Sequence, residues 1–152
     1  MTTSKEKGKT TAENFRLNRP ENYTNIWGVK KATEWIVNCE RLGSPVDRES
    51  VYLDLAKTAI NKASNYEGSF YNDLSDCADV LKSIYRNYQT LGIGSEKLKE
   101  LAPAMEGLGK QVYWKLLGSS TGSTAIASDR YVDACACVKD TFEEIETAFS
   151  EM

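Results

Sequence analysis

Two groups of acidic residues are the first candidates for chemistry in this sequence. Their members are Asp73, Asp76 and Asp79 in one group, and Glu143, Glu144 and Glu146 in the other. Carboxylates on facing helices can hold Mg²⁺ for the hydrolysis of nucleotides. Such sites need inward-facing acids at E-x-x-E and E-x-x-D spacings, but here the acids fall between the apolar positions and no suitable E-x-x-D is present. We therefore expect two solvated acidic faces, and a magnesium-dependent all-α nucleotide hydrolase is kept as an alternative.

Two glycine-containing segments precede helical patterns, so their backbone N–H groups are placed to bind an anion. These segments are residues 92–95 (Gly-Ile-Gly-Ser) and residues 118–124. Neither ends in the Gly-Lys-Ser/Thr of a phosphate-binding P-loop, and neither follows a predicted strand. We expect both segments to be helix-capping turns, and we predict no cofactor.

The sequence has no histidine and four cysteines. The lack of imidazole excludes catalytic pairs and zinc or haem sites that depend on histidine. Cys39, Cys77 and Cys135 fall on apolar faces, and Cys137 completes a C-x-C that helical geometry points in different directions, so a four-thiolate zinc site is not expected. Free thiols in a chain without an apolar export signal indicate a reducing, cytoplasmic location. We predict core cysteines, no bound metal and no enzyme activity.

Apolar residues at intervals of three and four predict the helices that position these groups. The predicted segments are residues 25–42, 44–67, 70–91, 95–116 and 131–149, and Gly43, Gly68 and Gly92 follow the first three. Pro103 lies inside the fourth segment, where we expect a kink or a break near Leu101. No stretch alternates long enough with the period of a strand. The predicted fold is all-α, a single bundle of about five antiparallel helices.

Two of these segments carry regular heptad seams of apolar residues. The seams are Phe70, Leu74, Cys77, Leu81, Ile84, Tyr88 and Leu91, and Tyr131, Cys135, Val138, Phe142, Ile145 and Phe149. Each is long enough to form a contact between subunits, but five amphipathic helices can also cover one another. We expect the seams to line the core of the monomer, with a subunit contact as the alternative.

Charge divides the chain into a basic beginning and an acidic body. Residues 1–31 hold seven basic and three acidic side chains, a net +4, whereas the other 121 residues hold 12 basic and 19 acidic ones, a net −7. Residues 1–22 also lack apolar periodicity and include Arg19-Pro20, which disfavours a helix. We predict a basic extended arm over residues 1–22 and a helical-bundle domain over residues 23–152. The arm either binds nucleic acid, docks on the acidic face of a neighbouring copy or stays solvated, and the acidic body favours the neighbouring copy over nucleic acid.

Aromatic side chains beside basic ones are the candidates for a binding surface. Trp27, Tyr71 and Tyr85 fall off the apolar stripes or at their edges, and basic residues follow Trp27 and Tyr85. Such pairs stack on unpaired bases or anchor protein contacts, and the acidic body favours protein contacts. The predicted partner-binding residues are Lys5, Lys7, Lys9, Arg16, Arg19, Trp27, Lys30, Lys31, Tyr71, Tyr85 and Arg86.

These features together predict a structural or assembly subunit rather than an enzyme. We expect it to form a homo-oligomer or to dock into a larger complex through its apolar seams and its basic arm. A nucleic-acid-binding small subunit of a ribonucleoprotein or nucleocapsid-type assembly is the alternative. A membrane partner is not expected, because no stretch of about 20 uninterrupted apolar residues is present.

Overall fold

The computed structural model describes residues 23–25, 27–68, 71–119 and 129–152, and the predicted arm over residues 1–22 lies outside them. Every regular element of the described residues is a helix, which confirms the all-α prediction. The helices are α2 (Gly28–Arg41), α3 (Arg48–Ser64), α4 (Tyr71–Leu91), α5 (Ser95–Lys99), α6 (Ala102–Met105), α7 (Leu108–Ser119) and α8 (Asp129–Ser150). None of them is both long and apolar enough to cross a bilayer.

Two glycines end helices where the sequence predicts that they should. Gly43 and Gly92 adopt the left-handed conformation, with φ of 76° and 77°, which costs glycine no side-chain clash. After α2, the Ser44 amide donates a hydrogen bond of 2.9 Å to the Cys39 carbonyl, and after α4 the Ile93 amide donates one of 2.9 Å to the Tyr88 carbonyl. Both ends are therefore Schellman motifs, which pair carbonyls that would otherwise lack a donor.

The segment predicted as one helix over residues 95–116 is three helices, α5, α6 and α7. Pro103 lies in the first turn of α6, where its missing N–H costs nothing, so the break comes just before it, as expected. Gly107, with φ of 72°, separates α6 from α7. The prediction of about five helices is wrong for this segment, because the proline and the glycine each interrupt it.

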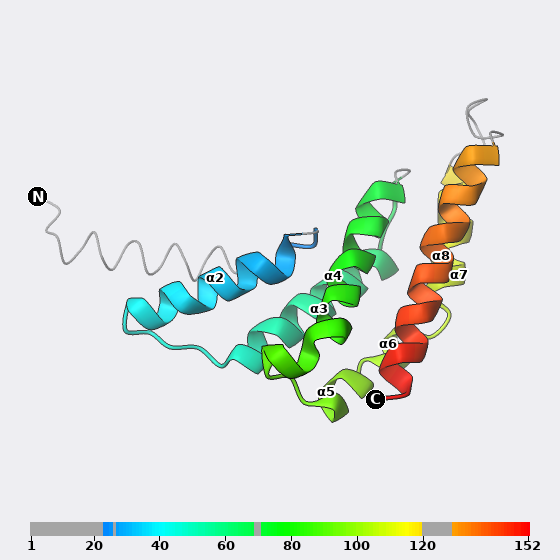
Figure 1. Ribbon diagram of the computed structural model, residues 1–152. Coiled ribbons are helices and arrows are strands. Elements are labelled where there is room, and N and C mark those ends of the chain that lie inside the picture. Colours follow the sequence, from blue (N-terminus) through cyan, green and yellow to red (C-terminus); the bar gives the residue numbers. More distant parts are fainter. Residues whose placement is uncertain (1–22, 26, 69–70, 120–128) are drawn as a thin grey trace, which may run out of the picture.

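Four helices form a two-layer arrangement. The layers are α4 with α8 and α3 with α7, and each helix also contacts one helix of the other layer, α4 on α3 and α8 on α7 (Figure 1). Helix α2 lies beside α3 and α4, and a hydrogen bond of 2.7 Å between the Thr33 and Tyr52 hydroxyls joins it to α3. The short helices α5 and α6 connect α4 to α7 at the end of the molecule where the C-terminus lies.

The direction of α8 differs from the prediction of an antiparallel bundle. The rings of Tyr71 and Tyr131, at the beginnings of α4 and α8, lie 6.1 Å apart, and those of Tyr85 and Phe149, near the ends, lie 6.3 Å apart. The two helices therefore run parallel. The reason is that α7 makes one full pass between them, so α8 begins at the end of the molecule where α4 begins.

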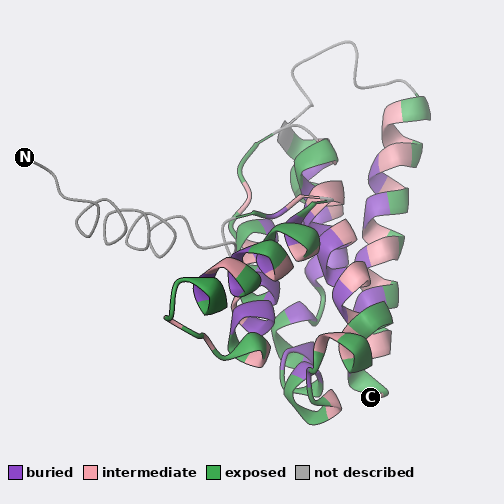
Figure 2. Ribbon diagram, turned by 60° about the vertical axis from the view of Figure 1, so that its left-hand side comes forward, coloured by how far each residue is buried: buried purple, intermediate pink, exposed green. Residues whose placement is uncertain are grey.

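Both apolar seams line the interior of the monomer, as expected. Leu74, Cys77, Leu81 and Ile84 of α4 are fully buried. The buried residues of α8 are Cys135, Val138, Phe142, Ile145 and Phe149. Figure 2 shows buried residues on the sides of the helices that face one another. Tyr88, Leu91 and Tyr131, at the ends of the seams, are half-buried. The middle positions of both seams are thus covered within one chain.

Candidate interaction surface

The two acidic groups do not come together into a metal site. Asp73 is exposed, Asp76 and Asp79 are half-buried, and burial, Asp79 and Asp73 raise the pKa of the Asp76 carboxyl. On α8, Glu143 contacts Lys139 Nζ at 3.5 Å. In the part of the chain that the structure describes, no three His, Cys, Asp or Glu residues are grouped so that they could hold a metal ion.

Three of the four cysteines are core residues. Cys39, Cys77 and Cys135 are buried, whereas Cys137 is exposed. Burial raises the pKa of the Cys77 thiol to about 11 and also raises that of Cys135. A thiol that resists deprotonation is a poor nucleophile and a poor metal ligand, so these cysteines act as small apolar residues.

Tyr85 and Arg86, which the sequence places in a binding surface, contact α8 of the same chain. The Tyr85 hydroxyl donates a hydrogen bond of 2.8 Å to Glu144 Oε1, and Arg86 Nη2 lies 4.0 Å from the same oxygen. The Arg86 guanidinium also lies 5.9 Å from the centre of the Tyr85 ring. Tyr71 packs edge-on against Tyr131 of α8. These side chains fasten α4 to α8.

Trp27 and Lys30 lie on the outer side of α2. The Trp27 side chain is 57% exposed, and Lys30 Nζ lies 5.6 Å from the centre of its ring. Lys31 is exposed and lies 3.8 Å from Glu34. Helix α2 thus presents a tryptophan and two lysines to solvent at the point where the chain continues from the predicted basic arm. The arm residues Lys5, Lys7, Lys9, Arg16 and Arg19 lie outside the described residues.

The most exposed large apolar side chain among the described residues is Trp114 of α7, which the sequence reasoning missed. It is 67% exposed, and its ring packs edge-on against Tyr113, with 5.4 Å between the ring centres. The signal for it is in the sequence: Val112 and Leu116 are buried, and a residue two positions from both lies on the opposite side of a helix.

Lysines accompany Trp114 without any acidic residue on the same helix. Lys110 is exposed one turn before Trp114, and Lys115 Nζ donates a hydrogen bond of 2.6 Å to the Ser64 carbonyl, which joins α7 to the end of α3. Lys57 is exposed on α3. Neither Lys57 nor Lys110 forms an ion pair with a residue that the structure describes.

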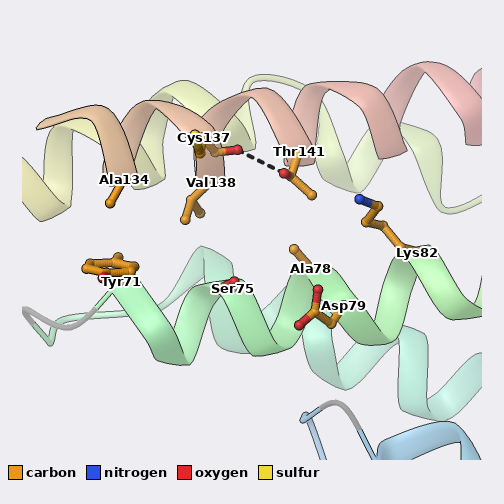
Figure 3. Close-up of a pocket in the computed structure, with 9 residues that line it drawn as sticks. All are labelled: Tyr71, Ser75, Ala78, Asp79, Lys82, Ala134, Cys137, Val138 and Thr141. Atoms are coloured by element: carbon orange, nitrogen blue, oxygen red, sulfur yellow. Dashed lines mark hydrogen bonds between the residues drawn. The ribbon is translucent and has the colours of Figure 1, made fainter. Parts of the chain in front are cut away.

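A groove of about 200 Å³ lies between α4 and α8 (Figure 3). Ala78 and Val138 are the buried residues that line it, and short side chains such as Ser75 and Ala134 leave it open. Cys137 lines its α8 wall, where its carbonyl accepts a hydrogen bond of 2.8 Å from the Thr141 hydroxyl. The groove is shallow and mixed in polarity, which is typical of a docking surface rather than of an enclosed catalytic site.

The two layers carry opposite charge. Helices α4 and α8 hold nine acidic and four basic residues, a net −5, whereas α3 and α7 hold five basic and two acidic residues, a net +3. Some of these charges lie where the layers meet: Lys62 of α3 lowers the pKa of Asp76 of α4, and Glu143 of α8 lies beside Gly109 of α7. The difference is therefore one of net charge between the two pairs of helices.

Known proteins offer no guide to the use of these surfaces. No protein-family model matches the sequence, and no curated protein or solved structure is significantly similar to this chain. The function therefore has to be argued from the chemistry of the surface.

Proposed function

We propose that this protein is a non-enzymatic assembly subunit that associates with further copies of itself and docks into a larger complex. The observation that carries the proposal is the pair of tryptophans, Trp27 and Trp114, which stand 57% and 67% exposed on separate helices, each close to lysine. Tryptophan is enriched at the centres of protein interfaces, where burying its large ring excludes water and stabilises the complex.

The opposite charges of the two layers support association between copies. Helices α3 and α7 carry a net +3 and helices α4 and α8 a net −5, so a head-to-tail contact between these pairs is attractive, and the attraction weakens as salt screens it. In this proposal the basic arm adds to that attraction by docking on the acidic α8 of a neighbouring copy.

Sedimentation velocity over a wide range of protein concentration tests the proposal. We expect the weight-average sedimentation coefficient to rise with concentration and to fall as salt is added. A protein that stays strictly monomeric at the highest concentration overturns self-association. Removing residues 2–20 is expected to weaken association at low salt, because five basic side chains are lost with them.

The absence of enzyme activity is tested separately. A nucleotide-hydrolysis screen with and without Mg²⁺ is expected to show no turnover above background. Turnover that requires Mg²⁺ and is lost in Glu143→Gln would overturn the proposal in favour of the hydrolase. Asp129→Asn, at the first residue of α8, is the matched control for the loss of one acidic charge from the same helix.

Nucleic-acid binding is the second candidate function, and the contact between Trp27 and Lys30 favours it. A tryptophan can stack on an unpaired base while the lysines of α2 and of the arm contact phosphates. If this candidate holds, single-stranded RNA binds with a steep salt dependence, with a slope of about −0.7 per phosphate contact. Loss of RNA binding after removal of residues 2–20, with self-association intact, would rank this candidate first.

A further inference from the structure

We infer that Trp114 of one copy inserts into the α4–α8 groove of the next copy, so that the basic α3–α7 layer of one domain covers the acidic α4–α8 layer of its neighbour. This inference rests on the self-association proposed above and specifies its two surfaces. Three properties of the described residues carry it: the exposure of Trp114, the shape of the groove and the charge around each.

The groove fits an aromatic ring. Its volume is about 200 Å³, the apolar side chains of Ala78 and Val138 line it, and the short side chains of Ser75 and Ala134 leave its mouth open. A ring placed there covers these apolar groups and buries the side chain of Trp114, which is 67% exposed in the monomer. A knob on one side of a molecule and a matching hollow on another side are the elements of a heterologous contact.

Charge orients the same contact. Lys110 lies one helical turn from Trp114, and α7 has no acidic residue. On the other side, Asp79 lines the groove, and Asp133 and Asp140 are exposed on α8 on either side of Cys137. The lining itself holds one acid and one base, Asp79 and Lys82, and Lys139 Nζ lies 3.9 Å from Asp140, so the negative charge comes from Asp133 and from the net charge of α4 and α8. Lysines around the ring thus meet carboxylates around the hollow, which raises the rate of encounter and fixes its direction.

The two surfaces belong to opposite layers, so each copy still has one free surface after the contact forms. The contact therefore repeats and produces species larger than a dimer. A buried aromatic side chain supplies about 150–250 Å² of a standard interface of about 800 Å² on each partner. The neighbouring side chains of α3 and α7 supply the remaining buried area, and most of the binding free energy comes from Trp114.

Substitution of Trp114 gives the first test. Trp114→Ala is expected to weaken self-association about 30-fold, the effect of losing a central interface residue. Because Trp114 is exposed, the change leaves the folded monomer intact, which circular dichroism confirms. Val37→Ala, at an apolar residue of α2 that is 39% exposed, is the matched control and is expected to leave association unchanged. Equal association of Trp114→Ala and wild type overturns the inference.

Disulfide trapping gives the second test and uses Cys137, the one exposed cysteine of the described residues. In Gln111→Cys, which keeps Trp114 and places the thiol at an exposed position one turn before it, each chain carries one thiol on the α7 surface and one in the groove. Oxidation in air with copper phenanthroline then joins the two thiols of neighbouring copies, with two electrons passing to oxygen. We expect a covalent ladder of trimers and larger species, whereas wild type, with Cys137 alone, stops at dimers.

Two controls make the trapping specific. Adding Cys137→Ser to Gln111→Cys is expected to abolish the ladder. Val37→Cys places a thiol on the exposed side of α2, where Val37 is 39% exposed, and is expected to give no ladder. Wild-type oligomers without a ladder in Gln111→Cys overturn this inference and leave the proposed function standing. A strictly monomeric wild type overturns the proposed function itself. If Trp114→Ala loses affinity for single-stranded RNA but keeps its self-association, the α7 surface binds nucleic acid and the inference is wrong.

Discussion

The close contact between α7 and α8 at Gly109 gives a stability prediction in which two known effects oppose each other. Gly109 lies inside α7, and a Cβ atom added there would stand 2.7 Å from the Lys139 carbonyl oxygen and 3.2 Å from Glu143 Cγ. The first of these neighbours is backbone of α8, which cannot move without shifting the helix. Gly118 lies in the same helix, and a Cβ atom there would meet nothing within 4 Å.

The magnitudes follow from these two surroundings. Replacing glycine by alanine in a helix stabilises it by about 1 kcal/mol. Overpacking a well-filled contact costs about 1–3 kcal/mol. Gly109→Ala is therefore expected to lower the free energy of unfolding by about 1 kcal/mol, and Gly118→Ala to raise it by up to about 1 kcal/mol. Because the helix-propensity gain is common to both variants, their difference measures the cost of the contact.

Urea unfolding followed by circular dichroism measures both free energies, with the m-value as a check that unfolding remains two-state. Thermal unfolding gives the same order, with about 2–4 °C for each kcal/mol in a chain of this size. If Gly109→Ala is as stable as Gly118→Ala or more stable, α7 does not lie against the backbone of α8, and the reasoning fails.

Three further predictions concern titrating and reactive side chains. Burial raises the pKa of the Cys77 thiol from 9.0 to about 11, so the unfolded chain loses this proton at a lower pH than the folded chain. The free energy of unfolding is therefore expected to fall by up to about 3 kcal/mol as the pH rises from 9 to 11, and Cys77→Ala is expected to lack this loss. Burial, Asp79 and Asp73 raise the pKa of the Asp76 carboxyl, so the folded chain favours its protonated form and loses stability as the pH rises. Asp76→Asn is therefore expected to have a higher free energy of unfolding than wild type near neutral pH, and a difference that persists unchanged below pH 3.8 argues against this cause. A maleimide is expected to label one thiol in the native chain and none in Cys137→Ser, because the other three cysteines are buried, and mass spectrometry counts the labels.

The sequence by itself determines the helices, most of their ends and the composition of the core. A 3.6-residue period shows which side of each helix must avoid water, and that alone places Leu74, Cys77 and Phe142 inside. Gly43 and Gly92 end helices because they accept a positive φ, which is a local property. The same local rule predicts the exposure of Trp114 from its position between Val112 and Leu116.

The tertiary structure decides which exposed groups remain available. By sequence alone, Trp27, Tyr71 and Tyr85 are equally good candidates for a binding surface, since all lie off or at the edge of an apolar stripe. In the fold, Tyr71 and Tyr85 meet α8, whereas Trp27 faces solvent, because periodicity specifies an apolar side but not the helix that covers the rest.

Helix direction and the distribution of charge are likewise properties of the packed chain. Pro103 and Gly107 break one predicted helix into α5, α6 and α7, and the single return pass of α7 makes α8 parallel to α4. That pairing gathers nine acidic residues on one layer, leaves five basic ones on the other and opens the groove between α4 and α8. The break at Pro103 follows from the sequence, but the direction of α8, the distribution of charge and the groove do not. They depend on how many times the chain crosses the bundle before two distant segments meet.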